Sequence, residues 1–112
     1  MLVLVVALTG WAVAPDDPGW TATDQMISVR TGPAGDQAVD LDTRFYLPEN
    51  RDGRVPAVLL AHGFGGTKDS VSDDAQSLAD RGYAVLTWTA QGFGGSGGQI
   101  HLDSPDYEVK DA

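Results

Sequence analysis

The chain of 112 residues contains no cysteine and only two histidines, His62 and His101. The absence of cysteine excludes disulfide bonds and Cys-ligated zinc. Two histidines are too few for a histidine-built metal site, and the acidic residues are scattered along the chain, which is typical of a solvated surface. We therefore expect neither a metal nor any other cofactor.

Basic residues are scarce as well. Seven Lys and Arg residues stand against 16 Asp and Glu residues, so the formal net charge is −9 and the isoelectric point is near 4.2. An acidic chain is repelled by the phosphates of nucleic acids and by anionic membrane surfaces. We predict no nucleic-acid partner, and membrane contact only through a possible N-terminal anchor.

A hydrophobic run long enough to span a bilayer is also missing. Residues 1–14 (MLVLVVALTGWAVA) are apolar but fall short of the roughly 20 residues that a spanning helix needs. They have the length of a signal-peptide core and end in a small-x-small pattern, although no Lys or Arg precedes them and Pro15 is a poor residue after a cleavage site. We predict an export signal or anchor and an extracytoplasmic location; a buried segment is the alternative.

The length leaves room for one small domain. Residues 15–23 are rich in Pro, Asp, Gly and Thr, which predicts a linker. Residues 25–31 and 38–47 alternate apolar and polar side chains around a turn at 32–36, so we predict an antiparallel hairpin. One face of its second strand is predicted to carry Val39, Leu41, Thr43, Phe45 and Leu47.

The pattern changes to two nearly continuous apolar runs at residues 55–61 and 83–89, each followed by a glycine-rich loop. Such runs predict parallel strands covered on both faces. Apolar residues at helical spacing predict a crossover helix over residues 70–81. The result is a βαβ unit whose loops emerge at the carboxyl ends of the strands, where open α/β sheets bind their ligands.

The ends of the helices carry local signals. Ser70 and Asp73 form a capping-box pattern at the start of the crossover helix, and Gly82 supplies its stop. Further along, Ser104-Pro105 predicts a cap followed by the first residue of a second helix.

The first glycine-rich loop reads His62-Gly63-Phe64-Gly65-Gly66. Glycines let backbone N–H groups approach a substrate oxygen closely, and such donors stabilise the oxyanion of acyl transfer. We predict an oxyanion hole that uses the backbone N–H of Phe64, with the His62 side chain in a structural role. The alternative is a glycine-rich turn that binds no ligand.

The second loop matches two motifs without their context. Residues 94–98 fit G-x-S-x-G around Ser96, but a nucleophile needs a strand directly before the turn and a helix directly after it. We therefore expect Ser96 to lie in a flexible glycine run and not to be the nucleophile. Gly92, Gly94 and Gly97 also fit G-x-G-x-x-G, so a dinucleotide-binding module using the Gly92–Gly97 loop remains an alternative.

Together, residues 55–66, 82–98 and 99–108 resemble the Xaa-Pro dipeptidyl-peptidase and cocaine-esterase-like hydrolases, which are serine peptidases and esterases with an α/β-hydrolase core. The resemblance implies that residues 24–112 are the N-terminal, incomplete part of an α/β-hydrolase sheet. It also implies a small peptide or ester substrate and an oxyanion-hole position at Phe64. Ala90-Gln91 departs from the Asp and Arg that such enzymes often carry there, which puts the polar bracing of the loop in doubt.

By the same resemblance, the catalytic serine, aspartate and histidine lie beyond the chain end, so we expect the chain alone to be inactive. We also expect apolar surface to be left partly uncovered at Val58, Leu60, Val85 and Leu86. The alternative from another class is a non-catalytic α/β interaction domain.

Overall fold

The computed structural model describes residues 18–49 and 52–112. The predicted export signal or anchor at residues 1–14 lies outside the described residues, as do residues 15–17 of the predicted linker. No helix in the described part of the chain is long and apolar enough to cross a membrane.

The strands form one mixed four-stranded sheet in the order β1-β2-β4-β3. Strands β1 and β2 are antiparallel, β2 and β4 are antiparallel, and β3 and β4 are parallel. The predicted hairpin and the predicted parallel pair are therefore confirmed. The strand bounds are Trp20–Thr31 (β1), Gln37–Pro48 (β2), Ala57–Ala61 (β3) and Ala84–Trp88 (β4).

Strand β1 begins earlier than predicted. Residues 20–23, expected to belong to a linker, pair with the end of β2, and Trp20 lies opposite Pro48. The Trp20 ring packs edge-on against Tyr46 with centroids 5.3 Å apart, and its Nε1 donates a hydrogen bond to Asp80 at 3.0 Å. These tertiary contacts overcome a local composition that resembles a loop.

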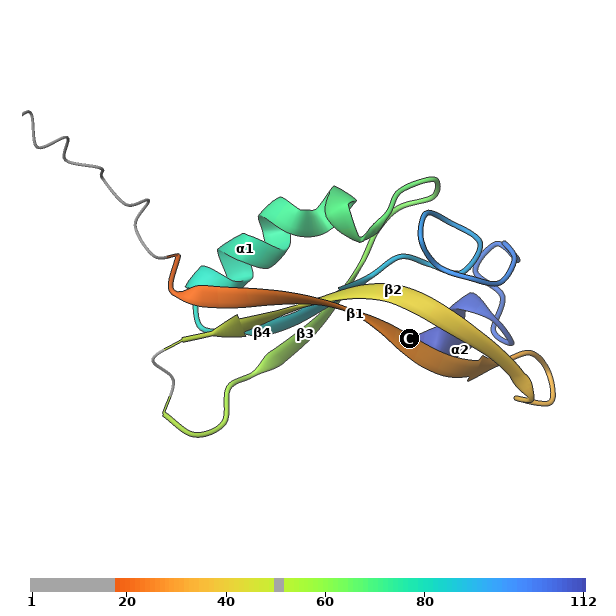
Figure 1. Ribbon diagram of the computed structural model, residues 1–112, viewed down its shortest axis with the longest axis horizontal. Helices are drawn as coiled ribbons and strands as arrows, with labels where there is room; N and C mark the ends of the chain where they lie inside the picture. The colour runs from red at the N-terminus through yellow and green to blue at the C-terminus, as the bar shows by residue number, and fades with distance from the viewer. Residues whose placement is uncertain (1–17, 50–51) are drawn as a thin grey trace, which may run out of the picture.

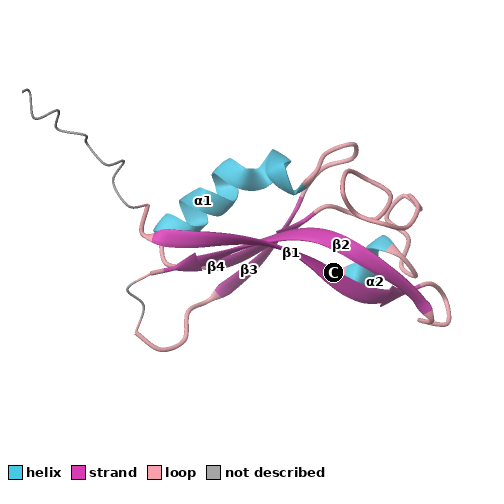
Figure 2. Ribbon diagram, viewed as in Figure 1, coloured by secondary structure: helices cyan, strands magenta, loops and turns pink. Residues whose placement is uncertain are grey.

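The crossover between β3 and β4 consists of a 3₁₀ turn, η1 (Lys68–Val71), followed by helix α1 (Ser72–Asp80), and it lies along one face of the sheet (Figure 1; Figure 2). The predicted Ser70–Asp73 capping box is wrong. Thr67 is the capping residue: its Oγ1 accepts from the Asp69 N–H at 3.2 Å, and its own N–H donates to Ser70 Oγ at 3.0 Å. Gly82, with a φ of +93°, ends the helix as predicted.

The core lies between α1 and the sheet, where Tyr46, Ala75, Ala79 and Val85 are buried. Val85 is fully buried, so the expectation that it would be uncovered is wrong. On β2, the predicted face is buried only over its first three residues, Val39, Leu41 and Thr43, and half-buried at Phe45 and Leu47.

The exposed apolar side chain of β3 lies on the other face of the sheet, away from α1. Leu59 is 56% exposed there, while its partner Leu86 on β4 is half-buried. Val58 and Leu60 are half-buried. Helix α1 therefore decides which of the predicted residues are covered.

Candidate active site

His62 follows β3 directly and connects the two glycine loops. Its Nε2 accepts a hydrogen bond from the Ala90 N–H at 2.9 Å, and its Nδ1 lies 2.6 Å from the Gly63 carbonyl oxygen. Because the Ala90 N–H can only donate, Nε2 is the unprotonated nitrogen, and Nδ1 carries the hydrogen that it donates to Gly63. Both ring nitrogens are engaged, which agrees with the predicted structural role and leaves no free base at this position.

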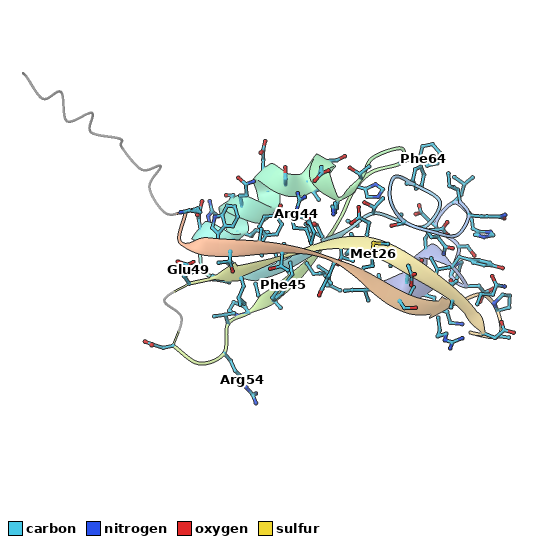
Figure 3. All side chains as sticks on the ribbon, viewed as in Figure 1. Met26, Arg44, Phe45, Glu49, Arg54 and Phe64 are labelled. Carbon is cyan, nitrogen blue, oxygen red and sulfur yellow. The ribbon has the colours of Figure 1, made fainter. Side chains whose placement is uncertain are left out.

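Phe64 lies at the turn of the first loop, which is closed by a hydrogen bond from the Gly66 N–H to the Gly63 carbonyl at 3.0 Å. The Phe64 side chain, labelled in Figure 3, is 79% exposed. It packs edge-on against Phe93 of the second loop, with ring centroids 5.4 Å apart. Within residues 18–49 and 52–112 the Phe64 N–H has no hydrogen-bond partner. A backbone donor is thus left available in the loop.

A cleft of about 450 Å³ opens between the two glycine loops and the C-terminal segment, at the carboxyl ends of β3 and β4. This is the end of an open α/β sheet at which ligands bind. The cleft is lined mainly by apolar and aromatic groups: Ala61, His62, Gly63, Phe64, Trp88, Ala90, Phe93, Ile100, Leu102, Asp103, Glu108, Val109 and Ala112.

Ser96 of the second loop is held by two hydrogen bonds, so the expectation that the run of glycines leaves its position unfixed is wrong. Its Oγ donates to the Thr89 carbonyl at 2.6 Å and accepts from the Asp42 N–H at 2.9 Å. The hydroxyl thereby connects β2 to the end of β4. Its proton points to a carbonyl oxygen and not to a base, so the geometry gives Ser96 a structural role.

The second loop does not lead into a helix. The next helix, α2, comprises Glu108–Asp111, and Tyr107 caps it without a side-chain hydrogen bond. The predicted start at Ser104-Pro105 is therefore wrong, because residues 105–107 form a turn. Neither a nucleophile elbow nor a dinucleotide fingerprint fits a loop in this position.

Gln91 has a bracing role that no local pattern in the sequence indicates. This side chain is 1% exposed, and its Nε2 donates to Asp111 Oδ2 at 2.8 Å and to Thr31 Oγ1 at 3.4 Å. Gln91 thus ties the second loop to β1 and α2, so the bracing that the sequence put in doubt is present in another form. Burial raises the pKa of Asp111 against the opposing effect of the hydrogen bonds from Thr31 and Gln91.

A charged cluster holds the first loop against the hairpin. Lys68, almost fully buried, pairs with Asp42 at 2.5 Å and with Asp24 at 3.4 Å. Arg44 bridges Asp24 and Asp69, each at 2.6 Å. Burial works against the charge of Lys68, but the two carboxylates outweigh it and raise the pKa of the lysine. No pattern in the sequence pointed to this cluster, because its members come from three separate segments.

The cluster also reaches the second loop, since the Lys68 N–H donates to Thr89 Oγ1 at 2.9 Å. Lys68 therefore connects the segment after the first loop to β1 and β2 through its side chain, and to the start of the second loop through its backbone. No group of three metal-ligating side chains occurs among the described residues.

Comparison with known proteins gives a family match over residues 35–112, to the X-Pro dipeptidyl-peptidase (S15 family). The chain belongs to this family. This chain is also 38% identical over 76 residues to the uncharacterized protein PA2218 of Pseudomonas aeruginosa, a match that covers 65% of this chain and 20% of the relative.

Solved structures agree on the fold. The crystal structure of hypothetical protein PA2218 superposes with a TM-score of 0.62 and 31% identity over 80% of this chain and 28% of that one. Potato epoxide hydrolase I superposes with a TM-score of 0.57 and 22% identity over 81% and 26% of the two chains, which is a likeness of fold alone. The sheet of this chain is therefore that of an α/β-hydrolase, in agreement with its membership of a family of hydrolases. The chain spans less than a third of the length of each of these relatives.

Proposed function

We propose that this chain supplies the oxyanion-hole loop of a serine hydrolase that cleaves an acyl bond in a small peptide or ester. The observation that carries the proposal is the Phe64 N–H, which has no partner among the described residues and belongs to a residue lining the cleft. His62 stabilises the loop through hydrogen bonds of both ring nitrogens, to the Gly63 carbonyl and the Ala90 N–H. A preorganised donor of this kind is the main requirement of an oxyanion hole.

The chemistry proceeds through an acyl-enzyme. A serine activated by a histidine attacks the acyl carbon, and the carbonyl oxygen takes up the negative charge that the Phe64 N–H stabilises. The histidine then passes the proton to the leaving amine or alcohol, and water releases the acyl group in a second, equivalent step. We propose that the serine, histidine and acid are supplied by segments downstream of residue 112.

The test is made on a polypeptide that carries this chain together with the downstream part of the fold. Phe64→Pro removes the N–H, whereas Phe64→Ala removes the ring and keeps the N–H. We expect the proline variant to lose about 100- to 1000-fold in kcat and the alanine variant to keep kcat within a few fold. Equal activity of the proline variant and the parent would refute the assignment, and circular dichroism of both variants controls for folding.

We propose further that residues 1–14 direct export, because their length and small-x-small ending fit a signal peptide. N-terminal sequencing of material made in the native host should find a mature chain starting near Pro15. Retention of the whole apolar run in a cytoplasmic product would contradict this proposal.

A further inference from the structure

Exposed apolar side chains gather at the cleft beside Phe64. Six large hydrophobic residues are exposed in the described part of the chain, and four of them line this one cleft: Phe64, Ile100, Leu102 and Val109. Leu102 is the most exposed leucine among the described residues, at 71%. Solvent-exposed apolar groups that converge on one concave site are typical of a ligand-binding surface.

Apart from the Phe64 N–H and the exposed Asp103 carboxylate, the polar side chains that line the cleft are engaged with the protein. Both nitrogens of His62 are used, and the two carboxylate oxygens of Glu108 accept from the His101 N–H at 2.5 Å and the Ser104 N–H at 3.1 Å. The remaining charged lining residue, Asp103, is exposed, and neither lysine nor arginine lines the cleft. A bound anion would meet two carboxylates and no cation, and burying an unpaired charge is unfavourable.

Glu108 also fixes residues 100–104, which form the wall of the cleft that follows the second glycine loop. Leu102 and Asp103 both have left-handed backbone angles, with φ of 57° and 56°, and this conformation is unfavourable for residues other than glycine. The two N–H groups that flank this pair are the donors to Glu108. The carboxylate therefore holds a strained turn that presents the Leu102 side chain to the cleft.

Ile100, in the same wall, packs against Gly92 of the second loop. A Cβ atom placed on Gly92 would lie 2.6 Å from the Ile100 nitrogen and 2.7 Å from its Cγ1, so a glycine at position 92 is what lets the wall approach the second loop. The apolar surface is thus positioned by contacts on both sides.

We propose that this cleft binds a neutral, apolar group of the substrate and discriminates against carboxylates, with Ile100 and Leu102 as specificity-determining residues and Glu108 as a positioning residue. The proposal rests on the proposed function, because it takes the cleft beside Phe64 to be the substrate site. Binding, however, requires no nucleophile, so it is measured on the full chain itself.

The experiment titrates the ¹⁵N-labelled full chain with benzamide and with benzoate, two aromatic probes of nearly equal shape that differ in charge. We expect benzamide to shift the amide signals of Phe64, Ile100 and Leu102, and benzoate to bind about tenfold more weakly or worse. Equal or tighter binding of benzoate would overturn the proposal, as would shifts that fall away from the cleft.

Matched leucine variants locate the site. Leu102→Asn removes the apolar group and suits the left-handed backbone, while Leu59→Asn alters an exposed leucine that does not line this cleft. We expect the first to weaken benzamide about fivefold or more and the second to leave it unchanged. Equal effects of the two variants would contradict the assignment.

Glu108→Gln tests the positioning residue, because an amide can accept from one of the two N–H groups but not from both. Benzamide binding should weaken, with amide shift changes confined to residues 100–108. Unchanged binding would exclude the positioning role. Failure of benzamide to bind leaves the Phe64→Pro test intact, and failure of that test leaves benzamide binding intact, so the two proposals fail separately.

Discussion

At the residue scale, the hydroxyl of Ser96 shows how a glycine-rich loop can be rigid. Its two hydrogen bonds reach the Asp42 N–H and the Thr89 carbonyl. Replacing Ser96 with alanine leaves both backbone groups without that partner. We expect Ser96→Ala to lower the free energy of unfolding by about 1–3 kcal/mol, measured by urea denaturation.

Ser77→Ala is the matched control, since Ser77 is exposed on α1. Its effect should stay within about 0.5 kcal/mol. If the two alanine variants are equally stable, the bracing role of Ser96 is wrong.

The residues of the site differ in how far they could be predicted from the sequence. His62 and Phe64 were assigned correctly to a loop directly after a strand, because that assignment needs only neighbouring residues. The predicted burial of this strand on both faces was wrong, since every residue of β3 is exposed or half-buried. The roles of Ser96 and Gln91 could not be predicted. Ser96 bonds to a residue 54 positions away and Gln91 to one 60 positions away, so only the folded sheet brings these partners together.

At the scale of the elements, the turn before α2 depends on an ionised carboxylate. Burial works against the charge of Glu108, but the backbone N–H groups of His101 and Ser104 outweigh it and lower the pKa of the carboxyl. A lowered pKa in the folded state stabilises the fold above the pH at which an unfolded glutamate titrates, and this stabilisation is lost as the pH falls through the folded value.

Glu108→Gln should therefore be less stable than the parent chain at neutral pH, and the gap should narrow on acidification. Urea denaturation between neutral and acid pH measures both effects. Glu49→Gln, which alters an exposed glutamate at the end of β2, should show no such narrowing (Figure 3). A pH-independent gap for Glu108→Gln would show that its charge does not hold the turn.

The strands and the crossover helix could be predicted because their apolar periods are strong and local. The ends of the elements were less predictable. Residues 20–23 have the composition of a loop but pair with β2, and Ser104-Pro105 has the composition of a helix start but lies in a turn before α2. In both places contacts between distant segments outweigh the local signal.

At the scale of the whole molecule, one face of the sheet remains partly open. Phe45, Leu86 and Leu59 lie side by side in register across β2, β4 and β3, and β3 is the last strand of the sheet. An apolar row that ends at an edge strand favours self-association. We expect the chain to associate at high concentration and Leu59→Lys to reduce this association, as measured by sedimentation velocity.

Met26→Lys serves as the comparison. Met26 is 53% exposed on β1, but its cross-strand neighbour is Asp42, so the surface around it already carries charge (Figure 3). This variant should change association little. If the two lysine variants reduce association equally, net charge and not the open apolar row is responsible.

The central proposal is that this chain provides the oxyanion-hole loop and that the nucleophile lies in another segment. Ser96 is the residue that fits a nucleophile motif by sequence, and its hydroxyl is committed to Thr89 and Asp42. The most direct measurement incubates the purified full chain with a fluorophosphonate probe and with p-nitrophenyl acetate, beside the Ser96→Ala variant. We predict no specific labelling and no turnover above the variant; labelling of the parent chain that disappears in Ser96→Ala would contradict the account.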